Sequence, residues 1–118
     1  MINKMKLANV LKKKQGNLKV WKRILMNLYL YGGYEPLKLT TITDLCYMHR
    51  NLTPKQRTNL YSTIRKTIEK LRISGLVKRY NNPVRYQLAY KKNVMGELAM
   101  IAKELGFEDA EPRDFSTV

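Results

Sequence analysis

The stretch between Thr53 and Gly75 restricts the fold of this chain more than any other part of its sequence. Thr53 suits the N-cap of a helix, Pro54 the first helical position, and Gln56 the place where a capping box takes Glu or Gln. Mostly apolar side chains then share one side of a helix with about 3.6 residues per turn: Leu60, Ile64, Thr67, Ile68 and Leu71. Gly75 favours the left-handed conformation that ends many helices. The sequence therefore predicts a long amphipathic helix over residues 54–74.

Two short strands are expected directly after this helix, at residues 76–80 and 84–88. The second run alternates apolar and polar side chains, which is the period of a half-buried strand. Asn81-Asn82-Pro83 separates the two runs, and asparagine tolerates the positive φ of a tight turn. The sequence thus predicts a β-hairpin at the C-terminal end of the long helix.

Two helices are predicted at the start of the chain. Residues 1–16 form a basic N-terminal element, with a weakly amphipathic helix or arm over residues 2–15. Residues 18–31 carry apolar side chains at helical spacing. Asn17 is a suitable N-cap for that second helix, and Gly32 can end it in a left-handed conformation.

A short strand and a short helix are expected before the long helix. The strand is placed at residues 38–40, after a proline that forces an extended path. The short helix spans residues 43–49 and is capped by Thr41 or Thr43. A brief connection at residues 50–52 then leads to the long helix.

The segment 93–106 contains the last predicted helix, over residues 93–105, which Gly106 ends. This helix has more apolar surface than a solvent-facing helix needs, so it packs on its own domain or pairs with a second copy. The candidate dimer-interface residues are Met95, Leu98, Ile101, Ala102 and Leu105. Residues 107–118 are acidic and are expected to form a loose tail.

The charge of the chain is large and unevenly distributed. The chain has 23 Lys and Arg against 9 Asp and Glu, for a formal net charge of +14. Residues 1–92 hold 21 basic and 3 acidic side chains, whereas residues 93–118 hold 2 basic and 6 acidic ones. Such a field attracts polyanions and is typical of nucleic-acid-binding domains. A surface that used lysine only for solubility would mix the two signs more evenly.

Catalytic, metal-dependent and membrane-spanning classes find no support in the sequence. His49 is the only histidine and Cys46 the only cysteine, which excludes a multi-histidine metal site and an internal disulfide. No run approaches the roughly 18 apolar residues of a membrane helix, and the N-terminus lacks the apolar stretch of a secretory signal. We therefore expect an intracellular protein that is not an enzyme and uses no cofactor or metal.

The order of the predicted elements resembles the winged helix-turn-helix family. The resemblance is most specific at residues 71–80, which end a helix and pass through Gly-Leu-Val, and at Tyr86-Gln87-Leu88, which matches the returning strand of a wing. It implies a mainly α fold with a small β-hairpin (α+β), in which residues 17–92 form a winged-helix domain with extra N- and C-terminal helices. The hairpin tip is shorter than in long-winged members, which argues against deep wing contacts. The Lys- and Tyr-rich composition is similar to that of small regulators of archaea and their viruses.

In this family the second helix of the motif enters the major groove, which here implies residues 54–74. The N-terminal part of such a helix usually meets base edges. The candidate base contacts are therefore Lys55, Thr58, Asn59, Ser62 and Arg65, and Lys66 is assigned to the phosphate backbone. The alternative is an ordinary solvated helix face, which every amphipathic helix has.

Further candidate backbone contacts lie in three other places. In the hairpin they are Lys78, Arg79 and Arg85. In the N-terminal arm they are Lys12, Lys13 and Lys14. At the start of the short helix, Thr43 can hold a phosphate. The respective alternatives are protection of an edge strand, a solvated lysine face, and simple helix capping.

These expectations together predict a transcriptional regulator that binds double-stranded DNA sequence-specifically. We expect a homodimer with the N-terminal or the C-terminal helix at its seam, in which each long helix reads one half-site. Two alternative functions stay open. One is a sequence-neutral architectural or replication-associated DNA binder, and the other is a protein-interaction adaptor built on the same fold.

Overall fold

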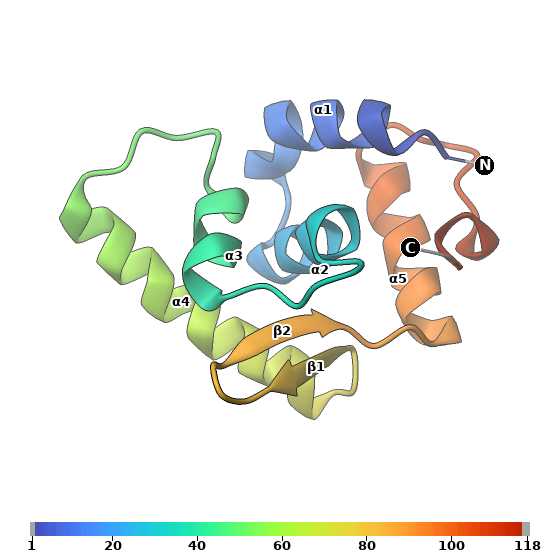
Figure 1. Cartoon of the computed structure of the whole chain (residues 1–118). Helices are drawn as coiled ribbons and strands as arrows, with labels where there is room; N and C mark the ends of the chain where they lie inside the picture. Colours follow the sequence, from blue (N-terminus) through green and yellow to red (C-terminus); the bar gives the residue numbers. More distant parts are fainter. Residues whose placement is uncertain (1, 117–118) are drawn as a thin grey trace.

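The computed structural model describes residues 2–116, which form a mainly helical α+β fold (Figure 1). Its α-helices are α1 (Lys4–Lys14), α2 (Val20–Tyr31), α3 (Leu39–Cys46), α4 (Pro54–Ile73) and α5 (Lys92–Glu104). The strands β1 (Val77–Tyr80) and β2 (Arg85–Leu88) form an antiparallel sheet, and 3₁₀ turns occupy Gln15–Asn17 and Pro112–Phe115. The coarse fold class predicted from sequence, helices with one small hairpin, is therefore confirmed.

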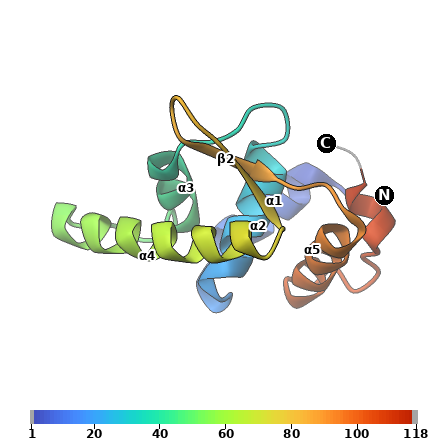
Figure 2. The ribbon, with the colours of Figure 1, turned by 90° about the horizontal axis from the view of Figure 1, so that it is seen from below.

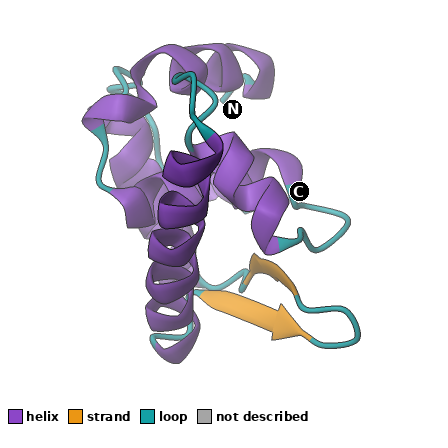
Figure 3. Cartoon of the chain, turned by 90° about the vertical axis from the view of Figure 1, so that its left-hand side faces the viewer, coloured by secondary structure: helices purple, strands orange, loops and turns teal. Residues whose placement is uncertain are grey.

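α2 forms the centre of the fold. Its six consecutive residues from Ile24 to Tyr29 are all buried, because α3, α4, α5 and β2 all contact this helix. α1 lies on the side of α2 that faces away from the hairpin (Figures 1 and 3). Asn27 is the one polar residue in the buried run, and its amide donates to the Gln15 side chain at 3.2 Å and to the Arg23 carbonyl at 2.9 Å. The middle of α2 is enclosed by these neighbours and is therefore apolar apart from Asn27, whose amide N–H groups find acceptors while its Oδ1 has no partner among the described residues.

α4 follows the prediction closely. The capping box is present, since the Gln56 N–H donates to Thr53 Oγ1 at 3.2 Å and the Thr53 N–H donates to Gln56 Oε1 at 3.0 Å. Gly75 has a φ of +82°, as a left-handed helix end requires. α4 packs on the core from Leu60 onwards, whereas residues 54–59 are all exposed and extend beyond the body of the protein (Figure 2).

The predicted hairpin is also present. Val77 pairs with Leu88 and Arg79 pairs with Tyr86 in the antiparallel register. Asn82, in the turn between the strands, has a φ of +62°, which asparagine tolerates better than most residues. The base of the hairpin is anchored in the core, because Val77 and Leu88 are both buried.

The predicted ends of α2 need correction. α2 begins at Val20 with Lys19 as its N-cap, and Asn17 lies instead in a 3₁₀ turn that continues from α1. Gly32 ends the helix, as expected, but with a φ of −109° rather than in the left-handed conformation. Glycine is needed there for a different reason, because a Cβ at this position would lie 2.9 Å from the Leu28 carbonyl oxygen.

The segment before α4 differs more strongly from the prediction. Residues 38–40 form no strand, because Lys38 caps α3 and the helix already begins at Leu39. The only sheet-like contact is at Leu37, whose N–H and carbonyl each make a 2.8 Å hydrogen bond with the backbone of Tyr86. α3 ends at Cys46, so the connection to α4 occupies residues 47–53 and is longer than expected.

The acidic C-terminal segment is not a loose tail over its described residues. It forms a 3₁₀ turn that contacts α5. Phe115 is 0 % exposed and meets the ring of Tyr29 edge-to-face at 5.0 Å between ring centroids. Its apolar positions therefore belong to the core, and this part of the prediction is wrong.

The proposed dimer seam on α5 also needs correction. Four of its five candidates are buried within the single chain, where α5 contacts α2 and the C-terminal turn: Leu98, Ile101, Ala102 and Leu105. Met95 is half-buried. These side chains already serve the monomer core, so a second copy cannot reach them without opening it. In the described part of the chain, no helix is both long and apolar enough to cross a bilayer.

Candidate nucleic-acid interface

The side of α4 that faces away from the core carries all the predicted base-contacting residues. Four of them are exposed and Ser62 is half-buried. Lys66 is exposed on the same side. Thr58 also donates its hydroxyl to the Pro54 carbonyl at 3.1 Å, so this side chain offers a ligand mainly its acceptor lone pairs. The structure therefore leaves this side of α4 open to solvent.

An ion pair between α3 and α4 supports the projecting part of α4. Arg57 Nη2 lies 2.7 Å from Asp44 Oδ2, and both side chains are about half exposed. This pair was not predicted, because the two residues belong to different elements and nothing in their spacing links them. Its energetic value is small, as for most exposed ion pairs.

Glu69 connects α4 to the hairpin. Its Oε1 lies 3.1 Å from Arg72 Nη2 and 3.5 Å from Arg79 Nη1, and its Oε2 accepts a 2.9 Å hydrogen bond from the Tyr86 hydroxyl. Burial and then the bond to Glu69 raise the pKa of Tyr86, so this hydroxyl remains a donor at neutral pH. The sequence gives no signal for these contacts, because Arg79 and Tyr86 belong to other elements than Glu69.

The two hairpin arginines point to opposite faces of the sheet. Arg79 pairs with Tyr86 and faces α4, whereas Arg85 pairs with Tyr80 on the other face. Gln87 shares that outer face, and its amide donates to the Gly32 and Gly33 carbonyls at 3.1 Å each. Arg79 is therefore the hairpin arginine beside α4, and the structure does not bring Arg85 to the same surface.

A hollow of about 430 Å³ lies where α3, α4 and the hairpin meet. Its wall includes three cations, Lys38, Arg65 and Arg79, and Glu69 as its acid. Arg65 and Arg79 were predicted as contacts from separate elements, and the fold places both on one wall. Lys38 was not predicted, because the start of α3 was misplaced.

Four other predicted contacts, from two elements, lie elsewhere. Lys12, Lys13 and Lys14 are exposed in the last turn of α1, on the side of α2 away from the hairpin (Figures 1 and 3). Thr43 is 1 % exposed and donates its hydroxyl to the Leu39 carbonyl at 2.8 Å. Because α3 begins earlier than predicted, Thr43 lies inside the helix, and its assignment as a phosphate contact is wrong.

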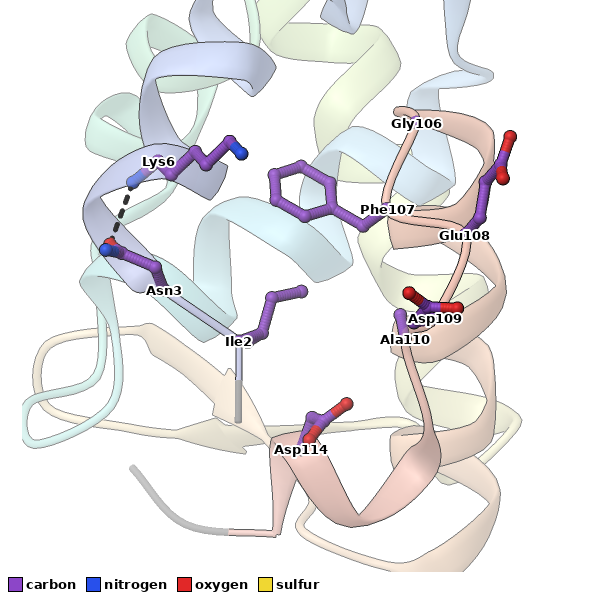
Figure 4. Close-up of a pocket in the computed structure, with 9 residues that line it drawn as sticks. All are labelled: Ile2, Asn3, Lys6, Gly106, Phe107, Glu108, Asp109, Ala110 and Asp114. Carbon is purple, nitrogen blue, oxygen red and sulfur yellow. Dashed lines mark hydrogen bonds between the residues drawn. The ribbon is translucent and has the colours of Figure 1, made fainter.

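The acidic residues of the C-terminal segment do not cover α4. Glu108, Asp109 and Asp114 surround a hollow near the N-terminus together with Lys6 and Phe107 (Figure 4). The pKa of the Asp114 carboxyl is lowered, chiefly because this carboxylate accepts a hydrogen bond from the Glu111 N–H. This acidic region lies with α1 and α5, at the other end of the protein from the projecting half of α4 (Figures 1 and 2).

The single cysteine is in the core. Cys46 is 0 % exposed, and its Sγ lies 3.6 Å from the Asn27 amide nitrogen. Burial raises the pKa of this thiol to about 12, which is the opposite of what a nucleophile requires. Within residues 2–116, no three or more His, Cys, Asp or Glu side chains form a group that could hold a metal ion.

A scan against protein-family models, a search of curated proteins and a search of solved structures each found no match to this chain. The arrangement of its own residues therefore carries the functional conclusion.

Proposed function

We propose that this chain is a winged helix-turn-helix protein that binds double-stranded DNA sequence-specifically and regulates transcription. The observation that carries the proposal is the exposed side of α4. It has Glu69 as its only acid, it extends beyond the body of the protein (Figure 2), and it adjoins the cationic hollow at the hairpin.

Base reading is assigned to the exposed side of α4 between Lys55 and Arg65. A helix fits the major groove, and its N-terminal part is the part that meets base edges. Asn59 is suited to a bidentate contact with adenine, and Arg65 to one with guanine. Both side chains are exposed, so binding requires no rearrangement of the core.

Phosphate binding is assigned to the cations around the base-reading side chains. Lys66 lies on the same side of α4, while Lys38 and Arg79 line the hollow beside it. The N-terminus of α3 has no side-chain cap, so its amide groups are available to a phosphate oxygen next to Lys38. These contacts would fix the register of the protein on DNA without reading its sequence.

The separation of charge favours one orientation of approach. The acidic residues of the C-terminal segment lie with α1 and α5, and the exposed side of α4 is cationic. A polyanion is therefore attracted most strongly to the end of the molecule that carries α4.

A two-fold dimer on a pseudo-palindromic site remains part of the proposal. Its seam must lie outside the buried side chains of α5. Sedimentation of the protein alone and with one duplex site measures the stoichiometry, and a single copy per two half-sites would contradict the dimer.

Salt dependence separates DNA binding from an adaptor function. If about 6–10 phosphates are neutralised, affinity for a duplex falls roughly 10³–10⁵-fold between 50 and 200 mM salt. Undetectable or salt-insensitive binding would favour the adaptor.

Selection of bound fragments from random DNA then tests specificity, because a regulator prefers its site by at least about 10³. An absence of preference would identify a sequence-neutral binder.

A pair of variants tests the assigned roles within α4. Asn59→Ala should cost about 1–3 kcal/mol on the selected site and relax the preference at one base pair, whereas Lys66→Ala should weaken all sequences alike and reduce the salt slope by about one. Lys103→Ala, an exposed lysine on α5, is the matched control and should change neither quantity. Equal effects of the first two variants on specificity would refute the division of roles.

A further inference from the structure

We infer that Glu69 is a positioning residue that holds the hairpin against α4, and that it strengthens DNA binding although its own charge opposes it. The inference rests on the proposed function and identifies a residue on which the shape of the proposed surface depends.

Both carboxylate oxygens of Glu69 are engaged by the elements on either side. Oε1 meets Arg72 on its own helix and Arg79 on β1, and Oε2 accepts the hydrogen bond from the Tyr86 hydroxyl on β2. One side chain therefore contacts both strands of the hairpin. The side chain of Glu69 is 30 % exposed, so these contacts are only partly screened by water.

The hairpin needs such an attachment beyond its base. A two-stranded hairpin is marginally stable on its own, and Val77 is the only buried residue of β1. Farther along the strands, two contacts hold the Arg79–Tyr86 pair. Glu69 contacts both side chains of the pair, and the backbone of Leu37 forms a bridge to the backbone of Tyr86. Loss of the Glu69 contacts would leave this part of the hairpin with the Leu37 bridge, the packing of the Tyr86 ring and the Gln87 bonds to the Gly32 and Gly33 carbonyls, none of which orders Arg79.

The geometry leaves Arg79 able to bind phosphate while Glu69 holds it. A guanidinium has five N–H donors in a fixed plane, and the Arg79 contact to Glu69 uses Nη1 at 3.5 Å. Glu69 thereby limits the orientations of Arg79 and orders it beside Arg65 in the hollow. Ordering a long side chain before binding reduces the entropy lost on binding.

Charge and position predict opposite outcomes for Glu69→Gln. This substitution removes one negative charge. If Glu69 did no more than repel phosphate, the variant would therefore bind duplex more tightly. If Glu69 positions the hairpin, the variant binds more weakly. When the docked hairpin falls to about one tenth of the population, the apparent affinity falls about tenfold.

Two further variants separate the effects. Tyr86→Phe removes the hydroxyl that donates to Oε2 and changes no charge at neutral pH, so we expect it to weaken binding in the same direction as Glu69→Gln. Glu35→Gln removes an exposed acid that lies in the loop before α3, and we expect unchanged or slightly tighter binding. Affinities are compared at one salt concentration and at a temperature where all variants are folded.

Hydrogen exchange of the free protein supplies a readout that needs no DNA. Hairpin amides should exchange faster in Glu69→Gln and Tyr86→Phe than in the parent and in Glu35→Gln, while α5 amides stay unchanged. Glu69→Gln binding at least as tightly as the parent, or Tyr86→Phe matching the parent in both measurements, would overturn the inference. If the parent protein binds no duplex, the proposed function fails, and the exchange data alone decide whether Glu69 holds the hairpin.

Discussion

Substitution of Phe115 by alanine tests whether the acidic C-terminal segment is part of the folded core. Phe115 is 0 % exposed and contacts the Tyr29 ring at 5.0 Å. Removing a fully buried phenylalanine costs about 3–5 kcal/mol, which combines the lost transfer free energy with that of the cavity left behind. A domain of this size is stable by about 5–15 kcal/mol, so the loss would be a large fraction of the total.

The expected shift in melting temperature follows from chain length. An unfolding entropy of about 2.1 cal/mol/K per residue gives roughly 0.25 kcal/mol/K for this chain, so the loss lowers Tm by about 12–20 °C. Urea unfolding followed by circular dichroism measures the free energy, and a thermal scan measures Tm. Tyr34→Ala is the matched control, since Tyr34 is an aromatic residue that is 87 % exposed.

The control should stay within about 0.5 kcal/mol of the parent protein. If Phe115→Ala also changed the unfolding free energy by no more than this, the C-terminal segment would be a loose tail. The packing of Phe115 on Tyr29 would then be refuted.

Two further predictions follow from shifted pKa values. Because burial raises the pKa of Cys46 to about 12, a thiol reagent at about pH 8 should label the native protein only as fast as it opens, and labelling at the rate of a free thiol would contradict this. Burial, followed by the charges of Arg23 and Arg50, lowers the pKa of His49 from 6.5. The unfolded chain then binds the proton more readily, so the histidine contribution to stability is complete above about pH 6.5 and is lost as the pH falls towards the folded-state pKa. Imidazole titration by NMR and urea unfolding at about pH 7.5 and 5.5 check this, and a His49 pKa at or above 6.5 would disprove it.

Features that depend on neighbouring residues were predictable. The capping box of α4 involves only Thr53 and Gln56, and the helix end at Gly75 depends on one backbone conformation. The turn at Asn82 is of the same kind. In each case the interaction closes within a few residues, so residue type and spacing are sufficient.

The candidate site was predictable only in part. The exposed side of α4 follows from helical periodicity, since the residues opposite an apolar stripe face solvent. The burial of Thr43 does not follow, because it depends on where α3 begins. Leu37 is placed by its backbone bridge to Tyr86 in a hairpin far along the chain, and Lys38 follows it as the N-cap of α3. The prediction of a dimer seam on α5 was wrong for a related reason. The sequence of an apolar stripe looks the same whether the stripe packs on another copy or on the rest of its own chain.

The sequence by itself determined α4 with its capping box, the hairpin and the uneven charge, because each depends on local spacing or on composition. Only the tertiary structure decided which charged and aromatic side chains meet: Asp44 with Arg57, Glu69 with Arg79 and Tyr86, and Phe115 with Tyr29. Each of these contacts joins residues from different elements. Such contacts are set by how the elements pack and by which surfaces the packing removes from water, and residue spacing along the chain does not contain that information.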